Sequence, residues 1–233
     1  MAKYRSKRYR AALEKIEQGK AYSLPEAVAL LKSLPAPKFD QTATLSFRLG
    51  VDPRQSDQMV RGTTPLPHGS GKAVRVLVFA TGEAAEAAKA AGAEYVGYED
   101  LLAKVKEGFQ DFDVAIATPA AMTEVRKLGK VLGPRGLMPN PKTGTVTDDT
   151  AKAVKEVKAG RVEFKLDKNA NIAVPVGKFS FNEEALTENG AAVIEAVVKA
   201  RPATAKGAFV EAITLAATMS PGLALDPAPF LKN

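Results

Sequence analysis

The sequence of 233 residues has no cysteine, no tryptophan and only one histidine, His68. Without cysteine it cannot form a disulfide framework, a thiolate nucleophile or a cysteine-ligated zinc site. A single histidine cannot build a histidine-ligated zinc site, and any Ser–His chemistry would have to lie at His68 itself. We therefore expect no metal and no cofactor, and we interpret His68 as an imidazole bonded to backbone.

Long apolar runs are also missing, because no stretch approaches the ~18 uncharged apolar residues of a membrane span. The N-terminus does not have the pattern of a secretory signal, since Met1 to Arg10 carries five cations instead of an apolar block. Together these features predict a cytoplasmic protein that makes no contact with a membrane.

Phosphate-binding loops are incomplete. A single glycine, Gly82, follows the apolar segment that ends at Ala80, whereas the dinucleotide fingerprint needs three glycines. The segment Gly69 to Lys72 resembles the end of a P-loop, but Ala73 replaces the hydroxyl residue that binds magnesium. These gaps argue against a nucleotide cofactor.

One alternative stays open: an α/β enzyme or small-ligand binder whose site lies in the cleft between two domains. A carboxylate pair assembled by the fold from distant residues would be compatible with the sequence.

The main feature that the sequence does contain is a change of pattern at Gly62 to Lys72. Two prolines and three glycines in this segment fit neither a helix nor a central strand. After it, apolar strands alternate with single helices, which predicts a doubly wound parallel sheet of the α/β class. Before it, and again after Gly160, amphipathic strands, a hairpin and helices predict an α+β fold.

These two patterns predict a split outer domain with a second domain inserted into it. Residues 1–67 and 160–233 form the outer α+β domain, and residues 68–159 form the inserted doubly wound α/β domain. The chain crosses between them through two hinge strands, for which we assign Pro67, His68, Gly69 and Gly160.

Hydrophobic periodicity places the individual elements. In the inserted domain we expect strands at Val74–Ala80, Tyr95–Val96 and Val114–Thr118, with helices at Glu83–Ala91, Glu99–Glu107, Ala121–Leu132 and Asp149–Lys158. In the outer domain we expect a helix to Gln18, a helix opened by the capping box Ser23–Glu26, and a helix from Asn182 to Ala200. Its strands are Gln41–Val51, a hairpin of Arg161–Lys165 with Ile172–Val176, and a last strand at Ala208–Ala217.

Charge and side-chain pattern point to a polyanion partner for the outer domain. Its residues hold 20 Lys+Arg against 14 Asp+Glu, whereas the inserted domain holds 13 against 12. In the first strand one face is a polar row of Thr42, Thr44, Ser46 and Arg48, which can meet solvent or a sugar-phosphate backbone. Phe39, just before this strand, is either a core plug or a stacking platform. A basic solvated surface is the competing explanation.

Three segments resemble one family closely: Asp52–Gln58 with Val60–Gly62, Leu66–Lys72, and the loop Leu128–Gly144 with its Leu-Gly-Pro-Arg-Gly-Leu-Met-Pro-Asn-Pro-Lys run. They are similar to the family of the protein numbered one of the large ribosomal subunit, which carries the mobile side stalk beside the tRNA exit site. The resemblance covers essentially the whole chain in order. It implies a cytoplasmic, ribosome-associated protein that is not an enzyme and is a monomer outside the ribosome.

The resemblance also implies three nucleic-acid partners. The outer domain would bind large-subunit ribosomal RNA, and the inserted domain would swing on the hinges while the protein assists the exit of deacylated tRNA. The third partner would be the protein's own messenger RNA, whose translation it would repress. The RNA-binding residues carried over to this sequence are Lys38, Phe39, Thr42, Thr44, Arg48, Arg54, Arg161, Lys165, Lys168, Thr218, Met219 and Ser220.

The sequence departs from the family at the last of these positions. The family usually has Thr-Met-Gly where this chain has Thr218, Met219 and Ser220, and Ala212 stands where a serine is expected. Glycine has no Cβ and tolerates positive φ, while the serine hydroxyl could add a phosphate or sugar bond. Because we expect steric relief to dominate, Ser220→Gly should bind RNA equally well or slightly better.

Overall fold

The computed structural model describes residues 5–17 and 19–230, which divide into two compact units. Unit 1 combines the residues up to Gly71 with those from Val162 onward, and unit 2 spans Lys72–Arg161. Each unit has its own hydrophobic core. Among the described residues, no helix is long and apolar enough to cross a membrane.

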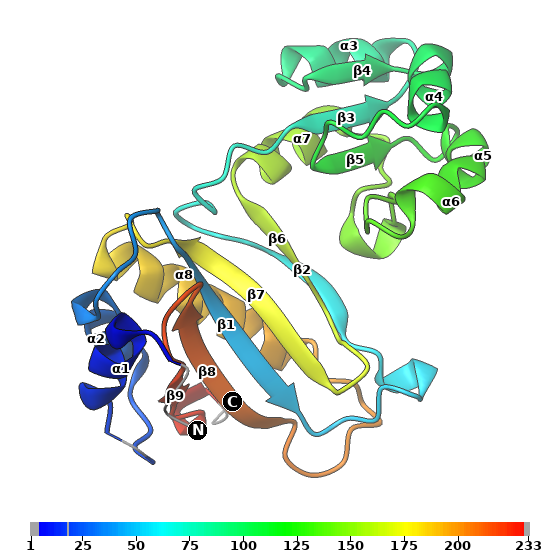
Figure 1. The fold of residues 1–233 in the computed structure, drawn as a ribbon. Helices are drawn as coiled ribbons and strands as arrows, with labels where there is room; N and C mark the ends of the chain where they lie inside the picture. The colour runs from blue at the N-terminus through cyan, green and yellow to red at the C-terminus, as the bar shows by residue number, and fades with distance from the viewer. Residues whose placement is uncertain (1–4, 18, 231–233) are drawn as a thin grey trace. The chain divides into compact units, whose positions relative to one another are not determined.

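Unit 1 is built on a four-stranded antiparallel sheet in the order β7-β1-β8-β9. The strands are β1 (Thr42–Leu49), β7 (Asn171–Lys178), β8 (Val210–Ala217) and β9 (Leu223–Leu225). Helices α2 (Leu24–Ser33) and α8 (Glu183–Lys199) pack on each other and on one face of this sheet, and α8 lies behind the strands in Figure 1. The opposite face is therefore left uncovered by these helices.

The sequence pattern explains how the covered face forms. Leu45, Phe47 and Leu49 alternate along β1 with polar residues and are buried against the helices. The predicted capping box at the start of α2 is present, since Ser23 and Glu26 bond to each other's backbone. Burying such large side chains stabilises the sheet by about 1.5–3 kcal/mol each.

Unit 2 is a three-stranded parallel sheet in the order β4-β3-β5, formed by β3 (Val76–Phe79), β4 (Tyr95–Gly97) and β5 (Val114–Ala117). One hydrophobic cluster joins the sheet to α3 (Glu83–Ala90) and α7 (Thr150–Lys158). The other joins it to α4 (Glu99–Lys106), α5 (Met122–Val125), the 3-10 helix η3 (Arg126–Leu128) and α6 (Gly129–Leu132). Helices on both faces of a parallel sheet confirm the predicted α/β class, and unit 1 confirms the α+β class.

Several predicted elements are wrong in detail. The segment Ala121–Leu132 is not one α-helix but the three consecutive short pieces α5, η3 and α6, because its middle residues Arg126–Leu128 take the tighter 3-10 form. Helix α1 (Lys7–Glu14) is shorter than expected, and the amide of Glu17 donates to the Tyr22 hydroxyl (3.0 Å) instead of continuing the helix. The predicted end of this helix at Gln18 lies outside the described residues.

The predicted hairpin of Arg161–Lys165 with Ile172–Val176 is also wrong. The turn exists, since the Asp167 amide donates to the Asn171 carbonyl (2.8 Å). However, β6 (Arg161–Lys165) pairs with β2 (Arg61–Pro65) in a separate two-stranded sheet, while β7 pairs with β1. The segment Ala208–Ala217 is not the last strand either, because β9 follows it.

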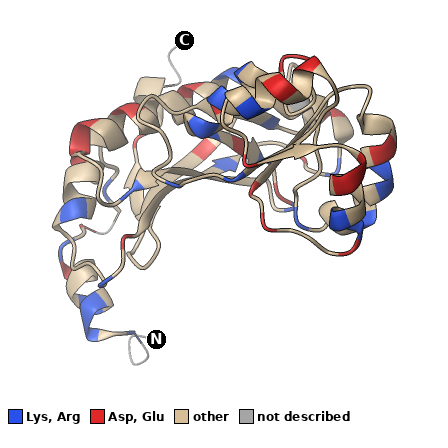
Figure 2. Ribbon diagram, turned by 90° about the horizontal axis from the view of Figure 1, so that it is seen from above, with Lys and Arg blue, Asp and Glu red and all other residues tan. Residues whose placement is uncertain are grey.

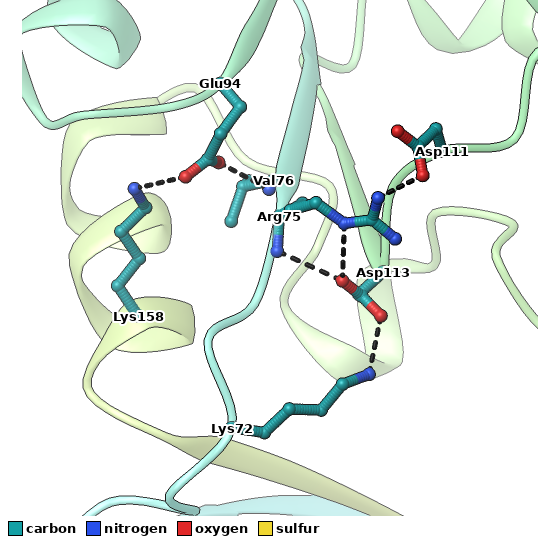
Figure 3. A network of polar contacts seen from close by, with 7 residues as sticks. All are labelled: Lys72, Arg75, Val76, Glu94, Asp111, Asp113 and Lys158. Carbon is teal, nitrogen blue, oxygen red and sulfur yellow. Dashed lines mark hydrogen bonds and ion pairs between the residues drawn. The ribbon is translucent and has the colours of Figure 1, made fainter.

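A network of ion pairs fastens the start of the unit 2 sheet (Figure 3). Asp113 accepts from the Lys72 ammonium (2.5 Å) and from both the amide (3.2 Å) and Nε (3.3 Å) of Arg75, which also pairs with Asp111. The Lys72 hydrogen bond, with help from Arg75, lowers the pKa of Asp113 to about 2. The carboxylate therefore ties the segment directly before β3 to the residue directly before β5.

The pKa of Asp113 falls from 3.8 to about 2, and one pKa unit corresponds to ~1.4 kcal/mol. Because the carboxylate is partly exposed, solvent screening reduces this contribution, and replacing Asp113 by asparagine is expected to destabilise unit 2 by at most about 2 kcal/mol at neutral pH. A depressed folded-state pKa gives stability that is complete above the unfolded value near 3.8 and is lost as the pH falls through about 2. Amides of β3 and β5 should thus be less protected from hydrogen exchange in the variant than in the parent at pH 6. At pH 2 this difference in protection should be much smaller. Asp111→Asn, at a more exposed ion pair, should cost under about 1 kcal/mol. Equal effects of the two substitutions would contradict the assignment.

Candidate nucleic-acid interface

The uncovered face of the unit 1 sheet is lined by hydroxyl groups and small side chains. Thr44 lies between Pro175 of β7 and Ala216 of β8, and the next polar position along β1, Ser46, lies between Ala173 and Thr214. No charged side chain occupies these two central rows. Such a face allows another molecule to approach closely and offers hydroxyl donors and acceptors to it.

Two large apolar side chains are exposed at the end of this sheet where β1 begins and β8 ends. Phe39 and Met219 are each 51% exposed, and neither belongs to the hydrophobic core of unit 1. Phe39 is therefore not the core plug that was one of its two interpretations. We call this group the Phe39–Met219 cluster and define it as Lys38, Phe39, Gln41, Thr42, Thr218, Met219 and Ser220.

Hydrogen bonds between β1 and β8 hold the two halves of the cluster together. The Thr218 hydroxyl accepts from the Thr42 amide (3.1 Å), and the Gln41 side-chain oxygen accepts from the Met219 amide (3.0 Å). Lys178, opposite Thr42 on β7, donates to the Thr42 hydroxyl (3.1 Å). The segments around residues 38–42 and 218–220, which are far apart in the sequence, thus form one surface.

The backbone beside Phe39 is fixed separately. The Asp40 carboxylate accepts from the amide of Ser180 (3.0 Å) and from its hydroxyl (2.9 Å). These two bonds anchor the chain after Phe39 to the end of β7. The phenyl ring therefore projects from a held backbone, which favours the interpretation of Phe39 as a stacking platform.

Ser220 has a different environment from the one we expected. Its hydroxyl accepts from the Ala217 amide (2.8 Å) and lies 2.9 Å from the Pro221 carbonyl, so it closes its own turn. A hydroxyl used in this way has little capacity left for a phosphate or sugar. Because glycine would leave the Ala217 amide without this acceptor, the structure favours weaker binding for Ser220→Gly, with the loss of about 1 kcal/mol that one hydrogen bond represents.

Ser220→Ala separates the two effects of the serine side chain. Alanine keeps the Cβ and removes only the hydroxyl, whereas glycine removes both. If the hydroxyl holds the turn, both variants should bind RNA about fivefold more weakly than the parent in equilibrium titrations, since ~1 kcal/mol corresponds to that factor. If Ser220→Gly binds more tightly while Ser220→Ala binds less tightly, steric relief dominates instead.

The remaining predicted cations lie at the other end of the sheet or in the other unit. Arg48 is exposed at the far end of β1, about 20 Å from Thr42 at ~3.4 Å per residue, and it pairs with Glu211 (2.9 Å). Lys165 and Lys168 are exposed and line a concave surface of about 490 Å³ with Pro53 and Met59. Arg54 is exposed in the segment between β1 and β2. These four cations form a second group on unit 1, distinct from the Phe39–Met219 cluster.

Arg161 belongs to unit 2, where its guanidinium pairs with Glu156 (2.8 Å) and is only 19% exposed. It does not share the uncovered sheet face with the other predicted residues. Ala212, the other departure from the family pattern, does lie on that face, exposed and opposite Arg48.

His68 also differs from the prediction. Its ring contacts a side chain, since Nε2 lies 2.6 Å from a carboxylate oxygen of Glu188, whereas we expected a backbone partner. The His68 amide donates to the side-chain oxygen of Asn189 (3.0 Å), whose nitrogen donates to the carbonyls of Gly69 (3.0 Å) and Val176 (2.8 Å). Asn189 therefore fixes the segment that contains Pro67, His68 and Gly69 to α8.

The residues predicted from the sequence did not include two that shape this region, Gln41 in the cluster and Arg8 beside it. Arg8 on α1 donates to the carbonyls of Pro35 (3.0 Å) and Met219 (2.9 Å). Nothing in the basic N-terminal run distinguishes Arg8 from its neighbours. Gln41 did have a signal, because it is polar at a position that the alternation of β1 directs inward, and it is buried.

Charge by itself does not mark the interface. Lys and Arg residues are interspersed with Asp and Glu over both units (Figure 2). In the described residues, 5–17 and 19–230, no group of three or more His, Asp or Glu side chains could hold a metal ion. The uncovered sheet face with its two exposed apolar side chains is the most distinctive surface of unit 1.

Comparison with known proteins identifies the family. Residues 30–221 match the family described as "Ribosomal protein L1p/L10e family". The chain belongs to this family. It is 56% identical over 223 residues to "Large ribosomal subunit protein uL1" of Bifidobacterium longum subsp. infantis, covering 96% of this chain and 97% of that one.

Two other members of the family show the same relation. The proteins of the same name from Thermobifida fusca and Renibacterium salmoninarum are 53% identical over 223 residues and 55% identical over 227 residues, respectively. These alignments cover 96% and 97% of this chain and 95% and 96% of the relatives. Membership of a ribosomal protein family decides against the enzyme alternative and confirms the resemblance seen in the three motif segments.

Proposed function

We propose that the chain is a structural protein of the large ribosomal subunit that binds large-subunit ribosomal RNA through unit 1. Family membership supports the ribosomal role, and the relatives' shared name refers to the large subunit. One observation carries the assignment of the site: Phe39 and Met219 are exposed on held backbone at the edge of an uncovered sheet face. The protein acts in the cytoplasm of a bacterial cell as part of the ribosome.

The composition of this surface suggests how the contacts are divided. Exposed cations such as Lys38, Arg54, Lys165 and Lys168 contact phosphates, which contributes affinity but little sequence information. The hydroxyl rows of β1 and β8 face riboses and base edges, since hydroxyls can both donate to and accept from the 2′-OH. Phe39 stacks on an unpaired base, and Met219 adds an apolar contact beside it.

Affinity for large-subunit ribosomal RNA is expected to fall steeply with salt. We assume that each of four cations neutralises one phosphate: Lys38, Arg54, Lys165 and Lys168. A plot of log affinity against log salt should then have a slope of about −3 to −4. Lys165→Gln should reduce the magnitude of that slope by about 1. Lys104→Gln, a change of the same charge on the surface of unit 2, should leave it unchanged. Filter-binding titrations between 50 and 200 mM salt would measure it, and a flat response would contradict the phosphate contacts.

The finer functions of the family are part of the same proposal. The protein assists the exit of deacylated tRNA and represses translation of its own messenger RNA by binding a structure that resembles its ribosomal site. Outside the ribosome it is a monomer. The support for these roles is the family resemblance over the whole chain, and competition between the messenger and ribosomal RNA for the Phe39–Met219 cluster would test the repressor role.

We also propose that unit 1 is the RNA-binding domain and unit 2 a domain that moves on the hinge residues Pro67, His68, Gly69 and Gly160. Positive φ angles at Gly69 (72°) and Gly160 (100°) support this assignment, because they let the chain turn where side chains disfavour it. Joining residues 1–71 to 162–233 through a short linker, which keeps the bonds of Asn189 to His68 and Gly69, tests the assignment of unit 1. The shortened protein should fold and keep most of its affinity for ribosomal RNA.

A further inference from the structure

The turn that carries Met219 is held by side chains from two distant parts of unit 1. Gln41, which precedes β1, is only 2% exposed, and its side-chain oxygen accepts from the Met219 amide (3.0 Å). Its own carbonyl accepts from the Phe179 amide (2.8 Å), which ties it to the end of β7 as well. A buried polar side chain must find a hydrogen-bond partner, and the partner of the Gln41 oxygen is the backbone of the exposed Met219 turn.

Arg8 completes the hold on the same residue. One guanidinium nitrogen donates to the Met219 carbonyl (2.9 Å) and the other to the Pro35 carbonyl (3.0 Å) at the end of α2. Met219 therefore has both its backbone amide and its backbone carbonyl bonded within the protein. What it presents to a ligand is its thioether side chain, which is half exposed.

We propose that Gln41 and Arg8 are positioning residues for RNA binding: they fix the backbone of Met219 so that its side chain packs on the face of a base or ribose. This inference rests on the proposed RNA-binding function. It also specifies the chemistry of the Met219 contact, which is apolar and made by the side chain, since the amide and carbonyl of Met219 are already bonded within the protein.

The physical reason is the cost of ordering a flexible side chain. Methionine has three rotatable bonds and adapts to many surfaces, so by itself it specifies a contact poorly. Holding its backbone before the ligand arrives removes part of the entropy that binding would otherwise lose. Gln41 and Arg8 themselves need not touch the RNA for this effect.

A double-mutant cycle in the full-length chain tests the proposal. Gln41→Leu removes the acceptor for the Met219 amide at similar side-chain size, and it should weaken binding to a large-subunit ribosomal RNA fragment about fivefold to tenfold. In the Met219→Ala background the same change should have less than a twofold effect, because the side chain to be positioned is gone.

Arg8 provides a second variant with a matched control, which keeps the test valid if Gln41→Leu fails to fold. Arg8→Ala and Arg10→Ala each remove one cation from α1, but only Arg8 bonds to the Met219 carbonyl. Arg8→Ala should weaken binding more than Arg10→Ala, and its excess should disappear in the Met219→Ala background. Methyl NMR of the free protein should show a shifted Met219 signal in the Gln41 and Arg8 variants.

The possible failures are distinguishable. Additive effects of Gln41→Leu and Met219→Ala, or equal effects of the two arginine substitutions, would overturn the positioning role while RNA binding by the parent stands. Parent-like affinity of Met219→Ala would overturn it too, because no contact would need positioning. If the parent chain does not bind the RNA fragment at all, the proposed function itself is wrong.

Discussion

Replacing Phe39 by alanine is expected to lower the affinity for large-subunit ribosomal RNA about 10- to 100-fold, the largest single effect on binding that the structure predicts. Stacking of a base on an aromatic side chain contributes about 1–3 kcal/mol by alanine substitution. Phe39 is half exposed, so its removal creates no cavity in the core and should leave the unfolding temperature almost unchanged. Titration of the RNA at fixed salt would measure the change.

Two further substitutions at the same position separate stacking from apolar contact. Phe39→Tyr keeps the ring and should bind nearly as well as the parent. Phe39→Leu keeps apolar area without a π face and should lose most of the affinity, because a flat ring is what stacks on a base. If alanine, leucine and tyrosine variants all bind as tightly as the parent, the Phe39–Met219 cluster is not part of the RNA surface.

The fold was predictable where the pattern is local. The alternation along β1 predicted a strand that the structure confirms, because one face of it must be buried. The helix expected from Asn182 to Ala200 is likewise confirmed as α8, whose inner face is buried. The pairing of β7 was not local. β1, more than a hundred residues earlier in the chain, lies between β7 and β8, so the turn at Asp167 could not reveal which strand β7 joins.

The candidate site was predictable only in part, for a related reason. The family resemblance indicated Phe39, Thr218 and Met219, and the structure places them on one surface, although RNA binding by them stays a prediction. Gln41 and Asn189 were missed, yet they share a signal: each is a polar residue at a position whose periodicity points inward. A buried polar group needs partners, and here they are backbone groups of the Met219 turn, of the segment with His68 and Gly69, and of β7, which apolar side chains could not bond.

Asn189→Ala is expected to have the largest effect on stability, lowering the free energy of unfolding of unit 1 by about 3 kcal/mol. The side chain is fully buried on α8 and makes three hydrogen bonds: it accepts from the His68 amide and donates to the carbonyls of Gly69 and Val176. Each buried backbone group that loses its partner costs about 1–3 kcal/mol, although some recover a partner by relaxation or by taking up water. The loss falls on the segment we assign as the first hinge.

Hydrogen exchange by mass spectrometry would measure this prediction locally and globally. In Asn189→Ala, exchange at His68 and Gly69 should accelerate first, and the peptides of α8 and β7 should follow as unit 1 loses stability, while those of β3 and β5 in unit 2 stay protected. Glu188→Ala is the matched control, because it removes the contact between the neighbouring residue of α8 and the His68 ring. The side chains of Glu188 and His68 are both exposed, so this change should lower the free energy of unfolding by less than about 1 kcal/mol. Parent-like exchange at His68 in Asn189→Ala would show that the hinge segment is held by other contacts, and equal losses in the two variants would place its anchor at the His68 ring as well.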